Sequence, residues 1–330
     1  MVGINVDSSG ASVRIRGRSV VLDGARGGPS NLRFLSHAHS DHIAGLRPGQ
    51  RVICSEPTSL LAALRGRILS RTTLKGVRLV PTGHILGSMA LSVPGEFLCT
   101  GDFNDRDRPF FSGFRPPTAK VLVTEATYGS QEFSFDSERQ VVEEAVDKIK
   151  ELLNLGKRVV ILGYPLGKSQ HLQMLFDGHL RPFPCYSWPS IERYNEIYRL
   201  FGKDKAKKTE VAGKSALDLL DGSGSVVYMP SYSKRIPFYE ELRKKGAVSM
   251  AFSGWSLLSG YSKGVDADHS FVISDHADFD GLIRSVERAS PERVYVTHGL
   301  TGELTRALRS RGFDARPLFR TESTISRFLD

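Results

Sequence analysis

The segment LSHAHSDHIAG constrains this chain more than any other part of its sequence, because it gathers metal-binding side chains at the end of a predicted strand, 32–36. His37 and His39 stand one residue apart where the chain leaves its regular pleat, so both imidazoles can point toward one place. Asp41 and His42 add a carboxylate and a third imidazole close by. Borderline and hard divalent metals bind such mixtures of nitrogen and oxygen donors, with positions left open for water. The alternative interpretation is a histidine-rich turn exposed to solvent.

Two later segments offer further ligands of the same kind. His84 lies in PTGHILGS, between glycines that allow close backbone approach, and Asp102 follows a predicted strand in CTGDFND. Each residue on its own is more often part of an ordinary turn. A site with two metal ions needs about seven protein donors, however, so each segment strengthens the case for the other.

Three more polar residues stand at the ends of predicted strands. They are Glu125 in VTEATYG, His276 in ISDHAD and His298 in VTHG. Active sites of α/β layers are built where several strand ends meet at one edge of a sheet. We therefore add these three side chains to the candidate site.

The secondary-structure pattern changes near residue 130. Before it, short β-branched or leucine-rich runs alternate with Gly/Pro-rich turns, and one clear helix is predicted, at 56–65. After it, helices and strands alternate, beginning with a helix at 136–154 and a strand at 158–162, and including a short helix at 216–220 and a strand at 271–274. Packed sheets are expected before the break, and a parallel α/β layer after it.

Composition and charge exclude several classes of protein. Lys and Arg number 45 against 36 Asp and Glu, a net charge of +9 with a pI near 9.5, which favours a polyanionic partner such as nucleic acid. No apolar run approaches the ~18 residues of a membrane span, and the N-terminus has no signal-peptide pattern. Cys54, Cys99 and Cys185 form no CxxC pair, which excludes a disulfide scaffold or thiolate zinc knuckle and predicts a reducing, cytoplasmic compartment.

In these motifs the chain resembles the β-CASP family of nucleases with a metallo-β-lactamase fold. The resemblance follows the family's order through VLDGARG, HAHSDH, GHILGS, GDF, TEATYG, GYPLGKSQ, SDHAD and THG. The short length and the C-terminal motifs look closest to the archaeal mRNA 3′-end processing factors and the DNA-ligase-associated exonucleases, which are related to the cleavage and polyadenylation factor nuclease and RNase J. The implied fold is an αββα sandwich, formed by residues 1–129 and 271–330, with a β-CASP α/β cap inserted at 130–270.

The same resemblance implies roles for individual residues. His37, His39 and His84 are expected to hold a first metal and Asp41, His42 and His298 a second, with Asp102 bridging the two. Zinc is the expected ion, and manganese is the alternative. Asp23 in VLDGARG matches a family aspartate that orients the metal-binding groups, the alternative being a plain turn residue.

The implied chemistry is hydrolysis of a phosphodiester bond, and we assign catalysis to Asp41, His276 and Glu125. Two metals that share a water lower its pKa and offset the charge that develops on the phosphate. His276 is the expected proton donor to the leaving oxygen, with Glu125 orienting its imidazole.

Substrate contacts are also predicted in the second half of the chain. Lys168 begins a predicted helix, where its charge favours a phosphate, although the family more often has Arg there and an exposed helix-start lysine is the alternative. Ser253 and Ser256 in FSGWS are further candidates, the alternative being ordinary turn residues. The KDKAKK stretch at 203–208 and the Arg-bearing C-terminal segment are expected to guide a nucleic-acid backbone or, alternatively, to be solvated faces.

The predicted function is that of a metal-dependent nuclease acting on single-stranded RNA or DNA. RNA processing or decay is favoured, because His at the position of His298 is usual in the RNA-acting members, and ligase-associated DNA end processing is the alternative. Thioester or lactam hydrolysis and a non-catalytic scaffold are the remaining hypotheses. A homodimer or a processing or repair complex is the expected assembly, and the cytoplasm the expected location. The sequence leaves open the direction of exonuclease action and whether cleavage is internal.

Overall fold

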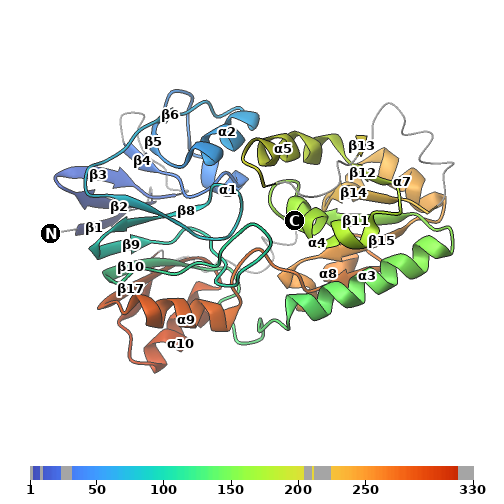
Figure 1. The fold of residues 1–330 in the computed structure, drawn as a ribbon. Coiled ribbons are helices and arrows are strands. Elements are labelled where there is room, and N and C mark those ends of the chain that lie inside the picture. Colours follow the sequence, from blue (N-terminus) through green and yellow to red (C-terminus); the bar gives the residue numbers. More distant parts are fainter. Residues whose placement is uncertain (1–2, 8–9, 24–31, 204–209, 212–223, 319–330) are drawn as a thin grey trace. The chain divides into compact units, whose positions relative to one another are not determined.

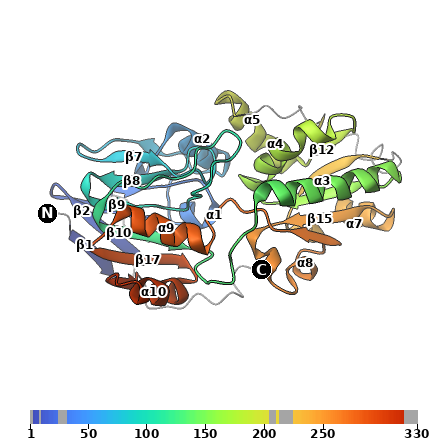
Figure 2. The same ribbon diagram turned by 60° about the horizontal axis from the view of Figure 1, so that its bottom comes forward.

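The computed structural model describes residues 3–7, 10–23, 32–203, 210–211 and 224–318. The chain divides into two compact units, shown in Figures 1 and 2. The first contains the described residues up to Ser134 and from His276 onward, and the second runs from Phe135 to Asp275. These limits lie close to the predicted ones, 130 and 270, and the assignment of the units as catalytic domain and cap stays a prediction. Within the described ranges, no helix combines the length and apolarity needed to cross a bilayer.

The first unit contains two mixed six-stranded sheets. One sheet runs in chain order, with antiparallel pairing among its first three strands and parallel pairing after them. Its strands are β1 (Gly3–Asp7), β2 (Gly10–Ile15), β3 (Arg18–Val21), β4 (Leu32–Phe34), β5 (Arg51–Ile53) and β6 (Ser70–Arg71). The other has the order β18-β17-β10-β9-β8-β7. Its strands are β7 (Arg78–Pro81), β8 (Met89–Val93), β9 (Gly95–Cys99), β10 (Ala119–Ala126), β17 (Arg293–Gly299) and β18 (Ala315–Pro317).

The two sheets pack face to face. Successive side chains of each strand point to opposite faces, so one set fills the core between the sheets. In β9, Phe97 and Cys99 lie in the core between the sheets, whereas Leu98 lies on the other face. There it packs with helices α9 (Phe279–Ala289) and α10 (Thr301–Ser310). Helices α1 (Ser40–Ile43) and α2 (Glu56–Leu64) lie beside the first sheet (Figure 1). The predicted αββα sandwich is confirmed, and burying a side chain such as Phe97 contributes about 1.5–3 kcal/mol to its stability.

The second unit is a parallel α/β layer with the strand order β13-β12-β14-β11-β15-β16. Its strands are β11 (Val159–Gly163), β12 (Cys185–Ser187), β13 (Glu210–Val211), β14 (Val226–Pro230), β15 (Val248–Phe252) and β16 (His269–Phe271). Its helices are α3 (Glu138–Asn154), α4 (Lys168–Leu180), α5 (Pro189–Leu200), α7 (Pro237–Lys244) and α8 (Tyr261–Gly264), with 3-10 turns η1 (Ser233–Arg235) and η2 (Gly254–Leu257). The central strands β11 and β14 are buried along their whole length, as expected for a parallel sheet covered on both faces.

Some local predictions differ from the structure. The strand predicted at 271–274 is wrong: the strand is β16, which ends at Phe271, and the chain then leaves the sheet. The three-residue strand β12 and the single-turn helix α1 were not predicted, because neither is long enough to show a period. The predicted helix at 216–220, residues 204–208 of the KDKAKK stretch, and the C-terminal segment beyond 318 lie outside the described residues.

Candidate metal centre

The HAHSDH motif lies where β4 ends and α1 begins. His37 and His39 belong to the irregular segment before the helix, and Asp41 and His42 lie on its single turn. The two adjacent residues differ in exposure: His42 is buried, at 2% exposed, whereas the side chain of Asp41 is 68% exposed.

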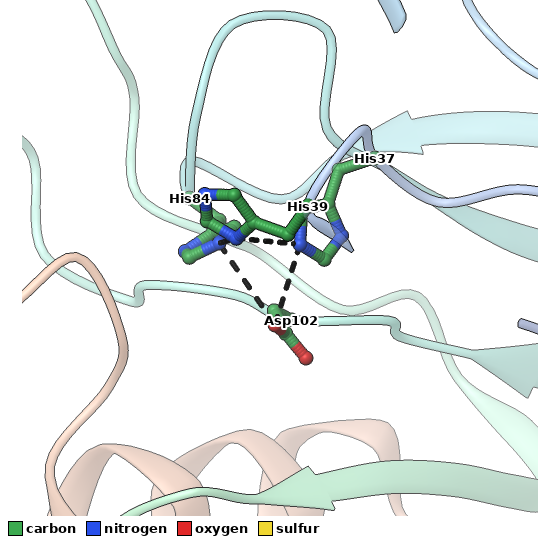
Figure 3. Close-up of side chains that lie close together, drawn as sticks. All are labelled: His37, His39, His84 and Asp102. Carbon is green, nitrogen blue, oxygen red and sulfur yellow. Dashed lines mark hydrogen bonds and ion pairs between the residues drawn. The ribbon is translucent and has the colours of Figure 1, made fainter. Parts of the chain in front are cut away.

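Three imidazole nitrogens of the predicted first site converge on one point. The Nδ1 of His39 lies 3.0 Å from the Nε2 of His37 and 3.2 Å from the Nε2 of His84. The Oδ2 of Asp102 approaches the same nitrogens, at 3.4 Å from His37 and 3.9 Å from His84, as Figure 3 shows. Two ligands of one tetrahedral zinc ion, with bonds of about 2.0–2.1 Å, stand roughly 3.3 Å apart. The spacing of these donors therefore fits a shared metal ion.

A second group of donors meets the first at Asp102. The Nε2 of His42 lies 3.4 Å from the Oδ2 of Asp102 and 3.5 Å from the Oδ2 of Asp41. This nitrogen is buried and makes no hydrogen bond among the described residues. The ring of His298 stacks on that of His42, with centroids 5.1 Å apart. A buried imidazole nitrogen facing two carboxylates fits a second metal ion, with Asp102 common to both groups.

Three ring nitrogens that face away from the centre have oxygen partners. His42 Nδ1 lies 3.1 Å from Asp23 Oδ2, whose other oxygen accepts a hydrogen bond from the Ser36 amide at 2.8 Å. The Ser36 hydroxyl lies 2.9 Å from His37 Nδ1, and the Thr297 hydroxyl lies 3.1 Å from His298 Nδ1. Such outer partners set the tautomer and orientation of metal-binding histidines. The geometry around Asp23 is that expected of the orienting aspartate.

Unusual backbone conformations bring these side chains inward. His298 has a φ of +52°, and the pairing of β10 with β17 shifts register between Glu125 and Ala126. Such conformations are costly for a non-glycine residue and concentrate at functional sites. Gly101 has a φ of +58°, and a Cβ there would stand 2.3 Å from the Cβ of Ser36. Close packing of these segments lets Asp102 reach the histidines.

Burial and mutual charge push the pKa values of the clustered groups apart. Burial and the neighbouring His42 hold the pKa of His37 well below its usual value. Burial also opposes protonation of His42, but the carboxylates of Asp102 and Asp41 outweigh it and raise its pKa well above the usual value. Burial opposes ionisation of Asp102, yet His42 and His37 lower its pKa well below the usual value. The carboxylates that favour a positive charge at His42 also favour a divalent cation, for which ligating histidines must be neutral.

His276 and Glu125 form a separate pair beside the histidine cluster. The Nδ1 of His276 lies 3.1 Å and 3.2 Å from the two carboxylate oxygens of Glu125, and its ring centroid is 4.4 Å from that of His84. Glu125 is 1% exposed and also accepts hydrogen bonds from the amides of Phe103 and Thr127. The carboxylate is thus held on three sides, and it orients the imidazole of His276.

Besides Ser36 and Thr297, two further contributing residues were not predicted from the sequence. Asn104 donates a side-chain hydrogen bond to the carbonyl of His276 at 3.2 Å. The buried guanidinium of Arg108 donates to the backbone carbonyls of Gly83 and His84. Both lie a few residues beyond Asp102, so the only sequence signal was their place next to a predicted ligand.

The predicted substrate residues lie in the second unit. Lys168 is 5% exposed, its Nζ donates to the Ile273 carbonyl at 2.5 Å, and it lies 3.4 Å from Asp275 Oδ1. It is therefore not the exposed helix-start lysine of the alternative interpretation. Ser253 accepts a hydrogen bond from the amide of Trp255, and the hydroxyl of Ser256 is buried without a hydrogen bond among the described residues. Contact of these three residues with substrate stays a prediction.

Comparisons with known proteins found similar chains, several of them named as ribonucleases. No family model matches the chain. It is 30% identical over 303 residues to a probable DNA ligase from Opitutus terrae, covering 87% of this chain and 28% of that protein. It is 26% identical to RNase aCSPSF2 from Saccharolobus solfataricus, covering 80% of this chain and 68% of the relative. Other curated relatives also carry ribonuclease names.

A solved structure supports the fold over the whole chain. The crystal structure of a protein of unknown function from Enterococcus faecalis V583 superposes with a TM-score of 0.61 at 14% sequence identity, covering 95% of each chain. The sandwich, the order of the motifs and the ribonuclease relatives agree. The chain is similar over about four fifths of its length to proteins named as ribonucleases, in agreement with its resemblance to the β-CASP nucleases of the metallo-β-lactamase fold.

Proposed function

We propose that this protein is a metal-dependent nuclease that hydrolyses phosphodiester bonds of single-stranded nucleic acid, with RNA as the preferred substrate. The observation that carries the proposal is the pairing of two donor groups, joined at Asp102, with a carboxylate-held imidazole at His276. Hydrolysis of a lactam or a thioester does not require the pair formed by His276 and Glu125. A scaffold has no need of an intact ligand set.

In this proposal His37, His39 and His84 hold one ion, Asp41, His42 and His298 hold the other, and Asp102 serves both. Two bound divalent ions, with zinc expected, supply Lewis-acid charge for the phosphate oxygens and make a neighbouring water acidic enough to react near neutral pH. The donor set of imidazoles and carboxylates suits zinc or manganese.

The chain's own contribution to bond breaking lies in His276 and its supports. The Nδ1 of His276 faces Glu125, which leaves Nε2 to give a proton to the departing oxygen. The amides of Phe103 and Thr127 keep Glu125 in place, and Asn104 holds the backbone of His276. The imidazole is thereby oriented before substrate arrives, which is the condition for effective proton transfer.

RNA is the first candidate substrate because the archaeal relative and several others are named as ribonucleases. DNA end processing is the second candidate, because the Opitutus relative is named a probable DNA ligase and this chain spans 28% of it. The two candidates share one site and one reaction and differ only in the sugar of the substrate.

A paired degradation assay tests the proposal. RNA and DNA single strands of one sequence, labelled at either end, are incubated with the protein and zinc or manganese. His276→Ala should lose activity, whereas His179→Ala, at an exposed histidine of α4, should retain it. Cleavage of RNA alone supports the first candidate, and preferred cleavage of DNA supports the second. Cleavage of neither polymer with either metal would overturn the proposal.

A further inference from the structure

The strand ends of the second unit form a surface that includes parts of the GYPLGKSQ and FSGWS motifs, and its exposed aromatic side chains were not among the predicted site residues. All strands of this sheet run parallel, so their C-terminal ends lie along one edge. The loops that leave this edge after β11, β14 and β15 comprise residues 164–167, 231–236 and 253–260. Open α/β sheets bind ligands at this edge.

Two solvent-exposed tyrosines follow adjacent strands at this edge. Tyr164 directly follows β11 and is 60% exposed, and Tyr232 follows β14 and is 47% exposed. They are the two exposed aromatic side chains among the described residues. Gly163 pairs with Pro230 in the sheet, and the Ser231 amide donates to the Gly163 carbonyl at 3.0 Å. The two strands that lead to these tyrosines therefore end about one strand spacing, ~4.8 Å, apart.

Hydrogen bonds hold the backbone beneath both rings. The carbonyl of Tyr164 accepts from the amide and the hydroxyl of Ser169, at 3.0 Å and 2.8 Å. The carbonyl of Tyr232 accepts from the Arg235 amide at 3.1 Å, which closes the turn η1. A tyrosine has few rotatable bonds, so a ring on a fixed backbone offers contact area at low entropic cost.

The charged side chains in the loops that carry these rings are all basic. Lys234, Arg235 and Lys263 are exposed, and Lys234 donates to the Gly264 carbonyl at 2.6 Å, which joins the Tyr232 loop to the segment after β15. Residues 164–167, 231–236 and 253–264 contain no acidic side chain. Exposed aromatic faces beside cations are what proteins use to bind single strands, because every base has a face that can stack and every linkage carries a negative charge.

We propose that Tyr164 and Tyr232 form a stacking site for unpaired bases of single-stranded nucleic acid, with Lys234 and Arg235 drawing its phosphates to the same loops. Bases in a duplex have no free faces, so such a site selects single strands. This inference rests on the proposed function and adds the part of the substrate that the second unit recognises.

The test is equilibrium binding measured by fluorescence anisotropy on the full, metal-loaded protein. One probe is a fluorescein-labelled single-stranded 12-mer with slowly hydrolysed phosphorothioate linkages. The other has the same backbone with every base removed. Tyr164→Ala and Tyr232→Ala should each weaken binding of the first probe by about 5- to 150-fold and leave binding of the abasic probe unchanged. Tyr164→Phe and Tyr232→Phe keep the aromatic ring and should bind like wild type.

The control substitution is Leu155→Ala, at a side chain 67% exposed beyond the end of α3, just before β11 begins. It removes a similarly exposed apolar group at the opposite edge of the sheet and should bind like wild type. Lys234→Gln and Arg235→Gln should each lower the salt dependence of binding, by about one unit of slope, for both probes.

The outcomes distinguish failure of the stacking site from failure of the proposed nuclease function. If wild-type protein binds the base-containing probe and the alanine variants match it, or if the abasic probe binds equally well, the stacking site is wrong while the nuclease proposal stands. If wild-type protein neither binds nor cleaves any single strand, both fail.

Discussion

The Oδ2 of Asp102 lies 3.4 Å from the Nε2 of His42, and the same oxygen lies 3.4 Å from the Nε2 of His37. One carboxylate oxygen is thus common to the two donor groups. Replacing it removes a ligand from both groups at once.

Asp102→Asn should therefore lower the bound metal from two ions per chain to one or none, and reduce nuclease activity by at least ~10²-fold. The measurement is metal content by mass spectrometry after dialysis, beside the cleavage rate. Asp107→Asn, in the same segment at a side chain 72% exposed, should keep both ions and full activity. Two ions retained by Asp102→Asn would contradict the bridging role.

His276→Ala should slow cleavage of an ordinary phosphodiester by about 10²–10⁴-fold, because the leaving oxygen then lacks its proton donor. The loss should be much smaller for bis(p-nitrophenyl) phosphate, whose leaving group needs no proton. Glu125→Gln should show the same pattern, because it disturbs the hydrogen bond that orients His276. Equal losses on both substrates would mean that His276 acts otherwise than as an acid.

Gly101→Ala should destabilise the first unit more than Gly95→Ala. Both glycines have positive φ, +58° and +73°, so the backbone strain is shared. A Cβ at Gly95 has nothing within 4 Å, whereas one at Gly101 stands 2.3 Å from the Cβ of Ser36. We expect a further loss of about 1–3 kcal/mol in the free energy of unfolding for Gly101→Ala, measured by urea denaturation. Similar losses in the two variants would contradict the close packing seen around Gly101.

The ion pair of Asp268 should make the second unit sensitive to acid. Burial opposes ionisation of Asp268, but hydrogen bonds from the Arg243 guanidinium and the Ser249 amide outweigh it and lower its pKa. A lowered folded-state pKa contributes stability above the unfolded value of about 3.9, and this contribution is lost as the pH falls through the folded value.

Asp268→Asn should accordingly reduce stability at pH 7, and the difference from wild type should shrink as the pH drops below about 4. Urea denaturation at a series of pH values measures it. Asp147→Asn, at an exposed position of α3, should show no such difference at any pH. A gap between Asp268→Asn and wild type that stayed constant down to pH 3 would rule out this linkage.

The three cysteines should differ in reactivity. Burial raises the pKa of the Cys54 thiol to about 12 and that of Cys99 well above its usual value, whereas Cys185 is half-buried. Iodoacetamide at pH 8 should therefore modify Cys185 first in the native protein, and all three thiols in denaturant. Intact mass and peptide mapping identify the sites. Early modification of Cys54 would be inconsistent with its burial directly after β5.

Local patterns in the sequence predicted packed sheets before residue 130, an α/β layer after it and the candidate ligands, and the motif resemblance implied the αββα sandwich. Alternating apolar side chains in strands such as β9 and the helical period of α3 are local patterns, because burial of one face sets the period of each element. The HAHSDH motif was equally readable, since its ligands are neighbours in the chain.

Only the tertiary structure decided which distant groups support those ligands. The hydrogen bonds from Asn104 to His276 and from Arg108 to the His84 loop join segments far apart in sequence, and no local pattern encodes them. The same holds for β16, which ends at Phe271 because its pairing with β15 ends there, although the apolar run continues to Ile273. Local side-chain pattern thus determined the elements and the donors, and non-local pairing decided where strands end and what orients each imidazole.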